Sequence, residues 1–185
     1  MSLSFLHYYF FNLSSSSYIN MSLLEAIYVG IGGTGGQIIK SQESFFREKQ
    51  YLYLDSEPDL RYGFDEFTGI ERNIYSKENL SSYFSKENPY ILFFGLGGKT
   101  GSYIITEILD HMVLNNIEYK CFCFYPYPFE PKLRIAIADE TVIRLKEFND
   151  VTILDMYEMK KRYPNLSPAS PFRIPNDILV QEYLV

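Results

Sequence analysis

Hydrophobic positions follow two different spacings along this chain. Mainly apolar runs, typical of buried strands, occur at 26–31, 51–54, 90–94, 119–124 and 151–154. Between them, apolar residues recur every three or four positions, as in amphipathic helices, over about 36–49, 104–113 and 135–148. Weaker patterns predict a short edge strand at 73–75, a helix from Ser76 to about Lys86, a helical turn ending at Arg162 and a last helix from Pro175.

This alternation of strands and helices predicts an α/β fold. We expect a doubly wound, Rossmann-like parallel sheet of about six strands with helices on both faces, in a three-layer α/β/α arrangement. Right-handed crossovers place every loop that follows a strand at one edge of the sheet, where such folds bind ligands. Residues 21–185 are expected to form this single domain. Residues 1–20 contain no Lys or Arg and end in a serine-rich stretch, and the tripeptide 21–23 repeats the tripeptide 1–3, so we expect an extra or disordered leader.

Composition and charge narrow the function. A formal net charge of −6 argues against a nucleic-acid-binding surface, although small anions can still bind locally. The leader lacks the basic flank of a signal peptide and is too short to span a bilayer. The only cysteines, Cys121 and Cys123, alternate with phenylalanines in a predicted strand, and their spacing favours core packing over a zinc site. We therefore expect a cytoplasmic protein that binds neither nucleic acid nor membrane.

Two glycine-rich loops carry the candidate chemistry. The loops at 30–36 and 95–102 each follow a predicted strand and precede a predicted helix. Glycine leaves room for the backbone to approach a ligand closely, and a helix start offers free N–H groups and a positive dipole end to an anion. Two such loops on one edge of a sheet predict two sides of one polyphosphate site.

These loops, together with the turn at 126–134, resemble the nucleotide-binding domain of the tubulin and FtsZ superfamily. The second loop is similar to the signature GGGTGSG, with Lys99 in place of the third glycine and Tyr103 in place of the last, and the turn is similar to P-F-x-F-E-G-x-x-R. The segment 55–58 is similar to the tubulin D-L-E-P turn near a magnesium ion, and 176–177 to the N-D pair that begins the family's central helix.

The resemblance implies that GTP or GDP binds with Mg²⁺, and it implies a role for each matching residue. Along the α and β phosphates would lie Gly32, Gly33, Thr34, Gly35 and Gln37; on the β and γ side Gly97, Gly98, Lys99, Thr100, Gly101 and Ser102; at the ribose Glu130 and Arg134; at the guanine edge Asp177; and near magnesium Asp55 and Glu57. Plainer interpretations stay open. Glu130 and Arg134 would form a surface pair, Asp177 would be an exposed first-turn acid, and Asp55 with Glu57 a solvated turn.

Departures from the family pattern bear on activity. The family's G-x-G-G-N-P loop and its acidic N-x-D-x-x-D loop are both absent from these 185 residues, so no catalytic residue is assigned and little or no hydrolysis is expected. Lys99 would either stabilise phosphate charge or block close approach. Besides guanine nucleotide, self-association or another protein partner stays open.

Two rival interpretations remain. The glycines of Gly30-x-Gly32-x-x-Gly35, with Asp55 twenty residues later, also satisfy the dinucleotide fingerprint, which favours NAD. The same segment also resembles the adenylating enzymes that activate ubiquitin-like proteins, which implies ATP. A Walker A motif fails because Phe93 stands where its first glycine is required. The other rival is a degenerate scaffold that binds no nucleotide and only presents a surface to partners.

Overall fold

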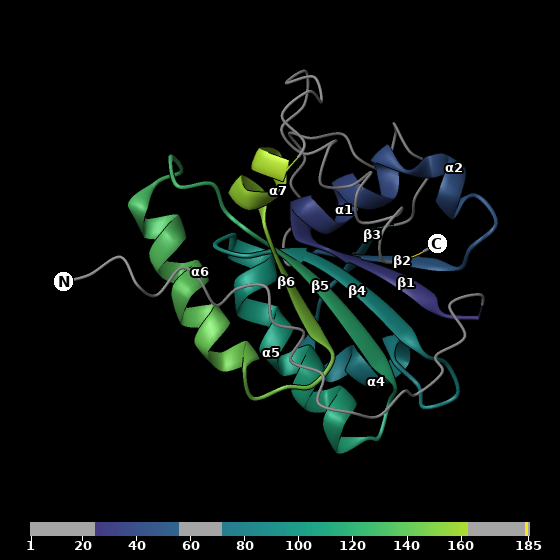
Figure 1. The fold of residues 1–185 in the computed structure, drawn as a ribbon. Helices are drawn as coiled ribbons and strands as arrows, with labels where there is room; N and C mark the ends of the chain where they lie inside the picture. The colour runs from purple at the N-terminus through teal and green to yellow at the C-terminus, as the bar shows by residue number, and fades with distance from the viewer. Residues whose placement is uncertain (1–24, 56–71, 163–183, 185) are drawn as a thin grey trace.

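The computed structural model describes residues 25–55, 72–162 and 184. Their centre is a six-stranded parallel sheet with the order β3-β2-β1-β4-β5-β6 (Figure 1). The strands are β1 (Ile27–Ile31), β2 (Tyr51–Asp55), β3 (Arg72–Ile74), β4 (Tyr90–Gly95), β5 (Tyr119–Tyr125) and β6 (Val151–Asp155). The predicted parallel α/β sheet of about six strands is therefore confirmed. The leader and the helix expected from Pro175 lie outside the described residues.

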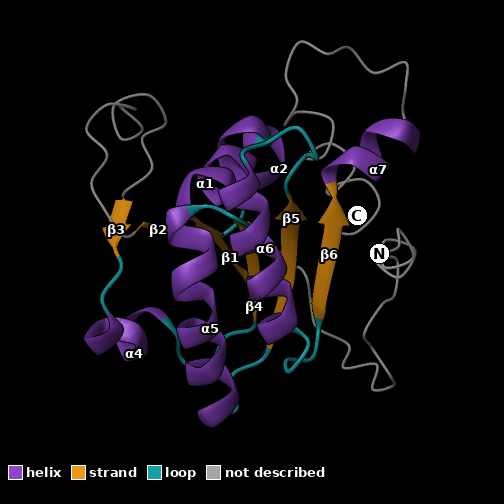
Figure 2. Cartoon of the chain, turned by 90° about the vertical axis from the view of Figure 1, so that its left-hand side faces the viewer, coloured by secondary structure: helices purple, strands orange, loops and turns teal. Residues whose placement is uncertain are grey.

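Helices cover both faces of the sheet, which gives the predicted three layers (Figure 2). The helices are α1 (Gly32–Ser41), α2 (Glu43–Phe46), the 3-10 turn η3 (Lys77–Asn79), α4 (Leu80–Tyr83), α5 (Lys99–Leu114), α6 (Lys132–Leu145) and α7 (Met156–Arg162). In Figure 1, α1, α2 and α7 lie on one face, and α4, α5 and α6 lie on the other. None of these described helices is long and apolar enough to cross a bilayer.

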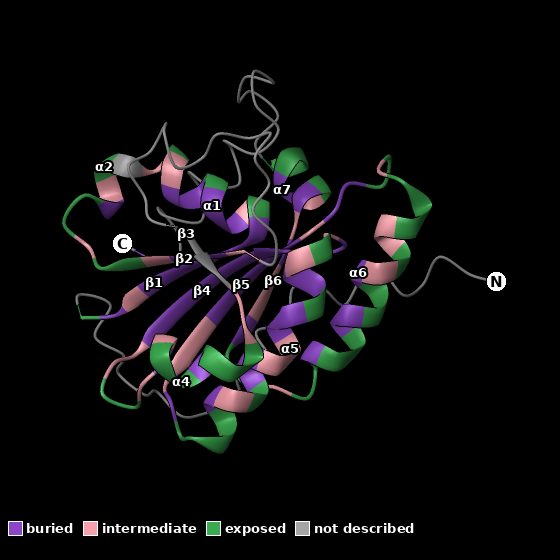
Figure 3. Cartoon of the chain, turned by 180° about the vertical axis from the view of Figure 1, so that it is seen from behind, coloured by how far each residue is buried: buried purple, intermediate pink, exposed green. Residues whose placement is uncertain are grey.

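Each face of the sheet has its own hydrophobic core. Along β4, Phe93 packs with the aromatic cluster under α1 and α2, whereas Leu92 and Phe94 pack under α5 and α6. A central strand that is buried on both faces has no polar side, which explains its uninterrupted apolar run (Figure 3). Cys121 and Cys123 are fully buried in the second core, as predicted, and burial raises the pKa of both thiols.

Two helix predictions need correction. The helix expected from Gly36 to Lys49 begins at Gly32 and is divided at Gln42, whose backbone leaves the helical region (φ −112°, ψ 34°). Gly32 has a positive φ of 64°, so the chain turns directly from β1 into α1. The helix expected from Ser76 to Lys86 is only η3 followed by α4, and Ser76 does not cap it. The Ser76 hydroxyl instead donates a hydrogen bond to the carboxylate of Glu78.

Candidate functional site at the switch point

The two glycine loops lie next to each other at the centre of one sheet edge. β1 and β4 are hydrogen-bonded neighbours, with Ile31 aligned to Phe94, so their carboxyl ends coincide. From β1 the chain continues outward to β2, and from β4 it continues outward to β5 in the opposite direction. The point between β1 and β4 is therefore the topological switch point, where open α/β sheets bind their ligands. The prediction that both loops share one edge is confirmed.

Side chains of each loop pack against the backbone of the other. A Cβ atom on Gly95 would collide with the side chain of Thr34, and one on Gly32 would lie 3.1 Å from Cβ of Thr100. Gly32 also has the positive φ that disfavours other residues. The starts of α1 and α5 therefore form one continuous surface.

Among the described residues, both helix starts at this surface lack a side-chain cap. In the described structure, α1 follows Ile31 and α5 follows Gly98, and neither helix has a side-chain cap or an acidic residue in its first turn. The first N–H groups of a helix have no partner within the helix, and its dipole makes that end positive. The two helix starts together fit one group with several negative charges.

The glycines divide into those that the fold requires and those that leave open space. A Cβ on Gly35 would collide with the carbonyl of Phe93, one on Gly101 with the carbonyl of Gly95, and one on Gly97 with Arg134. These three residues lack a side chain because neighbouring backbone lies too close, so their presence is no argument for a ligand. At Gly33 a Cβ would meet nothing within 4 Å, and at Gly98 only the Gly95 carbonyl at 4.0 Å. Among the loop glycines whose surroundings the structure describes, Gly33 and Gly98 keep the space that a ligand would use.

Asp55 reaches this surface from the end of β2. Its Oδ1 accepts a hydrogen bond from the Thr100 hydroxyl at 2.7 Å, and its Oδ2 accepts one from the Tyr53 hydroxyl at 2.9 Å. The contact with Thr100 joins residues 45 positions apart and crosses over β1. The acid and the second glycine loop were both predicted from the sequence, but their contact was not, because it depends on the strand order.

Glu130 and Arg134 form the ion pair that their spacing allowed, with 3.0 Å between Glu130 Oε2 and Arg134 NH1. Glu130 Oε1 also accepts a hydrogen bond of 2.8 Å from the backbone N–H of Tyr127. The pair lies at the candidate site, because a Cβ on Gly97 would lie 2.6 Å from Cγ of Arg134. The Arg134 Nε is buried and has no hydrogen-bond partner among the described residues. The backbone and Cγ of Arg134 therefore lie against the second glycine loop, and its guanidinium is paired with Glu130.

The remaining predicted residues differ in exposure. Gln37 is exposed one turn after Gly33, and Lys99 is exposed at the start of α5. Ser102 is buried, and its hydroxyl accepts a hydrogen bond of 2.8 Å from the N–H of Gly97, which closes the loop. Glu57 and Asp177 lie outside the described residues, and the described part contains no cluster of three metal-binding side chains.

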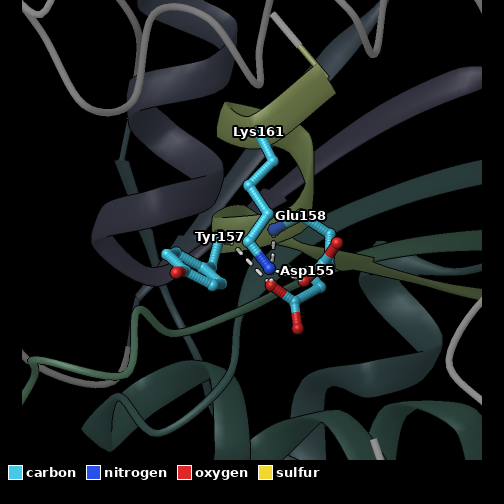
Figure 4. Close-up of polar contacts among 4 residues, drawn as sticks. All are labelled: Asp155, Tyr157, Glu158 and Lys161. Carbon is cyan, nitrogen blue, oxygen red and sulfur yellow. Dashed lines mark hydrogen bonds and ion pairs between the residues drawn. The ribbon is translucent and has the colours of Figure 1, made fainter. Parts of the chain in front are cut away.

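Another polar cluster at this edge is structural. Asp155, at the end of β6, accepts hydrogen bonds from the N–H groups of Tyr157 (2.8 Å) and Glu158 (3.1 Å), so it caps α7 (Figure 4). The Nζ of Lys161 lies 2.6 Å from Oε1 of Glu158 and 4.1 Å from the ring centroid of Tyr157. Burial is the main cause that raises the pKa of Asp155. α7 therefore has a side-chain cap, which α1 and α5 lack in the part of the chain that the structure describes.

The strand order and the paired loops at the switch point define a doubly wound α/β domain of the tubulin/FtsZ-like fold. The chain is similar to the empty FtsZ dimer of M. jannaschii, with a TM-score of 0.68 and 16% identity over 85% of this chain and 52% of that one. It is also similar to CetZ from Methanosaeta thermophila strain DSM 6194, with a TM-score of 0.63 and 13% identity over the same shares.

These structures confirm the fold that the sequence resemblance implied. At such low identity they show the fold alone, and the chain spans about half the length of each. No protein-family model matches the sequence, and no curated protein matches it.

Proposed function

We propose that this chain binds a guanine nucleotide, GTP or GDP, at the switch point and hydrolyses it slowly or not at all by itself. One observation carries the proposal: the uncapped starts of α1 and α5 lie side by side, each with a glycine, Gly33 or Gly98, that leaves space for a ligand. Backbone N–H groups in that arrangement are suited to phosphate oxygens. The tubulin/FtsZ-like fold supports the choice of nucleotide.

Charge at the site supports a polyphosphate. Although the whole chain carries −6, Lys99 and Arg134 place cationic side chains at the second glycine loop. Arginine is well matched to phosphate because its planar guanidinium presents several donors. Because the charge of Arg134 is paired with Glu130, the positive potential at this site comes mainly from the two helix starts and Lys99.

The donor set also fits magnesium. Mg²⁺ prefers oxygen ligands, and Asp55 with the Thr100 hydroxyl supplies a carboxylate and an alcohol beside the α5 start. A bound Mg²⁺ would neutralise charge between the phosphates and Asp55. Tyr53 would keep the carboxylate oriented, because it already donates to Oδ2.

Slow hydrolysis is supported by the contacts of the two described carboxylates at the site, Asp55 and Glu130. Asp55 accepts hydrogen bonds from Tyr53 and Thr100, and Glu130 accepts from the Tyr127 N–H and pairs with Arg134. A general base has to be free to take a proton from the water that it activates, and each of these carboxylates is already held by hydrogen bonds or an ion pair. We propose binding with little turnover.

A dinucleotide such as NAD is the second candidate, because the strand order is the one used by dinucleotide-binding folds. Gly35, in α1, packs against Gly30 of β1 and Phe93 of β4, and it also matches the third glycine of that fingerprint, which serves close helix–strand packing. In that case Asp55 would bind a ribose hydroxyl, and its contact with Thr100 would compete with the ribose.

Calorimetric titration with GTP, GDP, ATP and NAD, each with and without Mg²⁺, distinguishes these candidates. We expect the guanine nucleotides to bind most tightly and Mg²⁺ to strengthen their binding. Tighter binding of NAD would favour the dinucleotide candidate. Absence of binding by any of the four would favour a scaffold that binds no nucleotide. Phosphate release, measured over a wide range of protein concentrations, tests the turnover.

A further inference from the structure

Tyr75 connects Asp55 to the helix that begins at the second glycine loop. It follows β3 directly, and its backbone N–H donates a hydrogen bond of 2.7 Å to the carbonyl of Asp55. Its ring is partly buried against the second core. Its hydroxyl donates a hydrogen bond of 2.5 Å to Oε2 of Glu107 on α5. One residue is therefore bonded both to the acid at the candidate site and to α5.

These contacts close a ring with the hydrogen bond from Thr100 to Asp55. Thr100 and Glu107 are seven residues apart, so they lie on the same face of α5, about 10 Å apart along its axis. Asp55 is thus attached to the first turn of α5 through its carboxylate and to a point two turns later through Tyr75. Two attachments along one helix fix its direction as well as its position.

The two attachments should respond differently to a ligand. The Asp55 carboxylate and the Thr100 hydroxyl are the groups assigned above to Mg²⁺, so binding the metal would compete with the hydrogen bond between them. The contacts of Tyr75 use neither group, because they involve the Asp55 carbonyl and the Glu107 carboxylate. They can therefore persist when the site is occupied.

We propose that Tyr75 and Glu107 are positioning residues, which keep Asp55 aligned with the start of α5 while a nucleotide and Mg²⁺ occupy the site. This inference rests on the proposed nucleotide binding and deepens it, since it assigns a role to two residues outside both glycine loops. Neither residue has to touch the ligand. Residues that orient a metal ligand from behind commonly change metal affinity by about tenfold or more when they are lost.

The first test measures GTP affinity with saturating Mg²⁺ and with EDTA, and takes the ratio of the two as the Mg²⁺ enhancement. Tyr75→Phe keeps the ring and removes the hydroxyl, and it should lower this enhancement about tenfold or more. Its affinity in EDTA should stay within about threefold of the wild-type value, because the Thr100–Asp55 hydrogen bond still holds α5 there. In an Asp55→Asn background, Tyr75→Phe should have no further effect on the enhancement.

Variants of the two partners of Glu107 and of Glu107 itself supply the controls. Glu107→Gln keeps an oxygen acceptor for the Tyr75 hydroxyl and should preserve the enhancement, whereas Glu107→Ala should lower it as Tyr75→Phe does. Lys77→Met is the matched control, because it breaks the other contact of Glu107, an ion pair of 3.4 Å, and leaves the Tyr75 hydrogen bond in place. The Lys77 side chain is 68% exposed, and pairs of this kind contribute little, so the enhancement should not change.

A second readout needs no nucleotide. Tyr75→Phe and Thr100→Val each remove one hydroxyl attachment of α5. Within one ring of contacts, loss of either attachment lets the helix shift and weakens the other. The urea midpoint of the double variant should therefore fall by less than the sum of the two single shifts. Additive shifts would show that the attachments are independent and would overturn the inference.

The outcomes separate this inference from the proposed function. If Tyr75→Phe weakens GTP equally in Mg²⁺ and in EDTA, or leaves the enhancement unchanged, the positioning role is wrong while nucleotide binding stands. Equal affinity of the wild-type protein with and without Mg²⁺ would remove the magnesium assignment and this inference together. If the wild-type protein binds GTP in neither condition, the proposed function itself fails and the positioning role falls with it.

Discussion

Replacing Gly98 by Asp should make the protein more stable and prevent nucleotide binding. Gly98 is the N-cap of α5, its backbone (φ −87°, ψ 160°) lies in the extended region that any residue adopts, and a Cβ there meets only one atom at 4.0 Å. An Asp at this position would accept hydrogen bonds from the N–H of Thr100 or Gly101. Those are the donors that we assign to phosphate.

The substitution should raise the stability of the fold and lower the affinity for nucleotide. A carboxylate cap gains a few tenths of a kcal/mol over glycine and about 0.3–1 kcal/mol from the helix dipole, so the melting temperature should rise by about 1–4 °C. A phosphate oxygen about 4 Å from the new carboxylate would be repelled by about 4 kcal/mol at an effective dielectric constant near 20. That repulsion corresponds to roughly a thousandfold loss of affinity.

Gly98→Asn is the matched control, because it caps the helix with a side chain of the same size and no charge. It should lose about tenfold or less, the effect of competing for one neutral hydrogen bond. Melting curves and calorimetric titration of GTP with Mg²⁺ measure both properties. If the Asp and Asn variants bound GTP within about threefold of each other, charge at the α5 start would not matter and the phosphate assignment would be refuted.

Three further predictions follow from single contacts. Gly33→Ala places a methyl group in open space, so it should stabilise the fold by up to about 1 kcal/mol and weaken GTP binding. Gly35→Ala drives a methyl group into the Phe93 carbonyl and should destabilise the fold by about 1–3 kcal/mol. Equal melting temperatures of the two variants would contradict this difference. Asp55→Asn should remove most of the Mg²⁺ dependence of GTP affinity, and titrations in which that dependence persists would exclude the carboxylate as a Mg²⁺ partner. Burial raises the pKa of Asp155 above its ordinary 3.8, so the folded state holds more protons than the unfolded state and stability falls as the pH rises from that value through the folded pKa. Asp155→Asn keeps the cap and should remove this fall, measured by urea unfolding at a series of pH values above 3.8; an unchanged slope would show that another group causes it.

Much of the fold could be predicted from the sequence because it depends on local patterns. The apolar run of β4 and the periodic apolar face of α5 each identify an element without knowledge of its neighbours. The strand–helix alternation then makes the sheet parallel and brings both glycine loops to one edge. Local patterns failed where a helix began inside a glycine loop, because the start of α1 depends on how closely it packs against β1 and β4.

The roles of individual site residues were decided by the tertiary structure. From the sequence, every glycine of the two loops is equally consistent with phosphate binding. The fold shows that Gly35, Gly97 and Gly101 are needed for close backbone packing, and that Gly33 and Gly98 leave open space. This distinction depends on atoms from other strands and helices, which no local pattern specifies.

Contacts between distant residues were likewise beyond the sequence. The Asp55–Thr100 hydrogen bond requires β2, β1 and β4 to lie side by side, and the contact of Arg134 with Gly97 requires α6 to begin beside the second loop. The sequence motif contains Phe129, but it did not show that this ring stacks on Tyr127 and is exposed. The sequence by itself determined which residues reach this edge of the sheet, because parallel strands and right-handed crossovers follow from local alternation. Only the packed structure decided which of them face a ligand, because exposure is a property of the surrounding atoms.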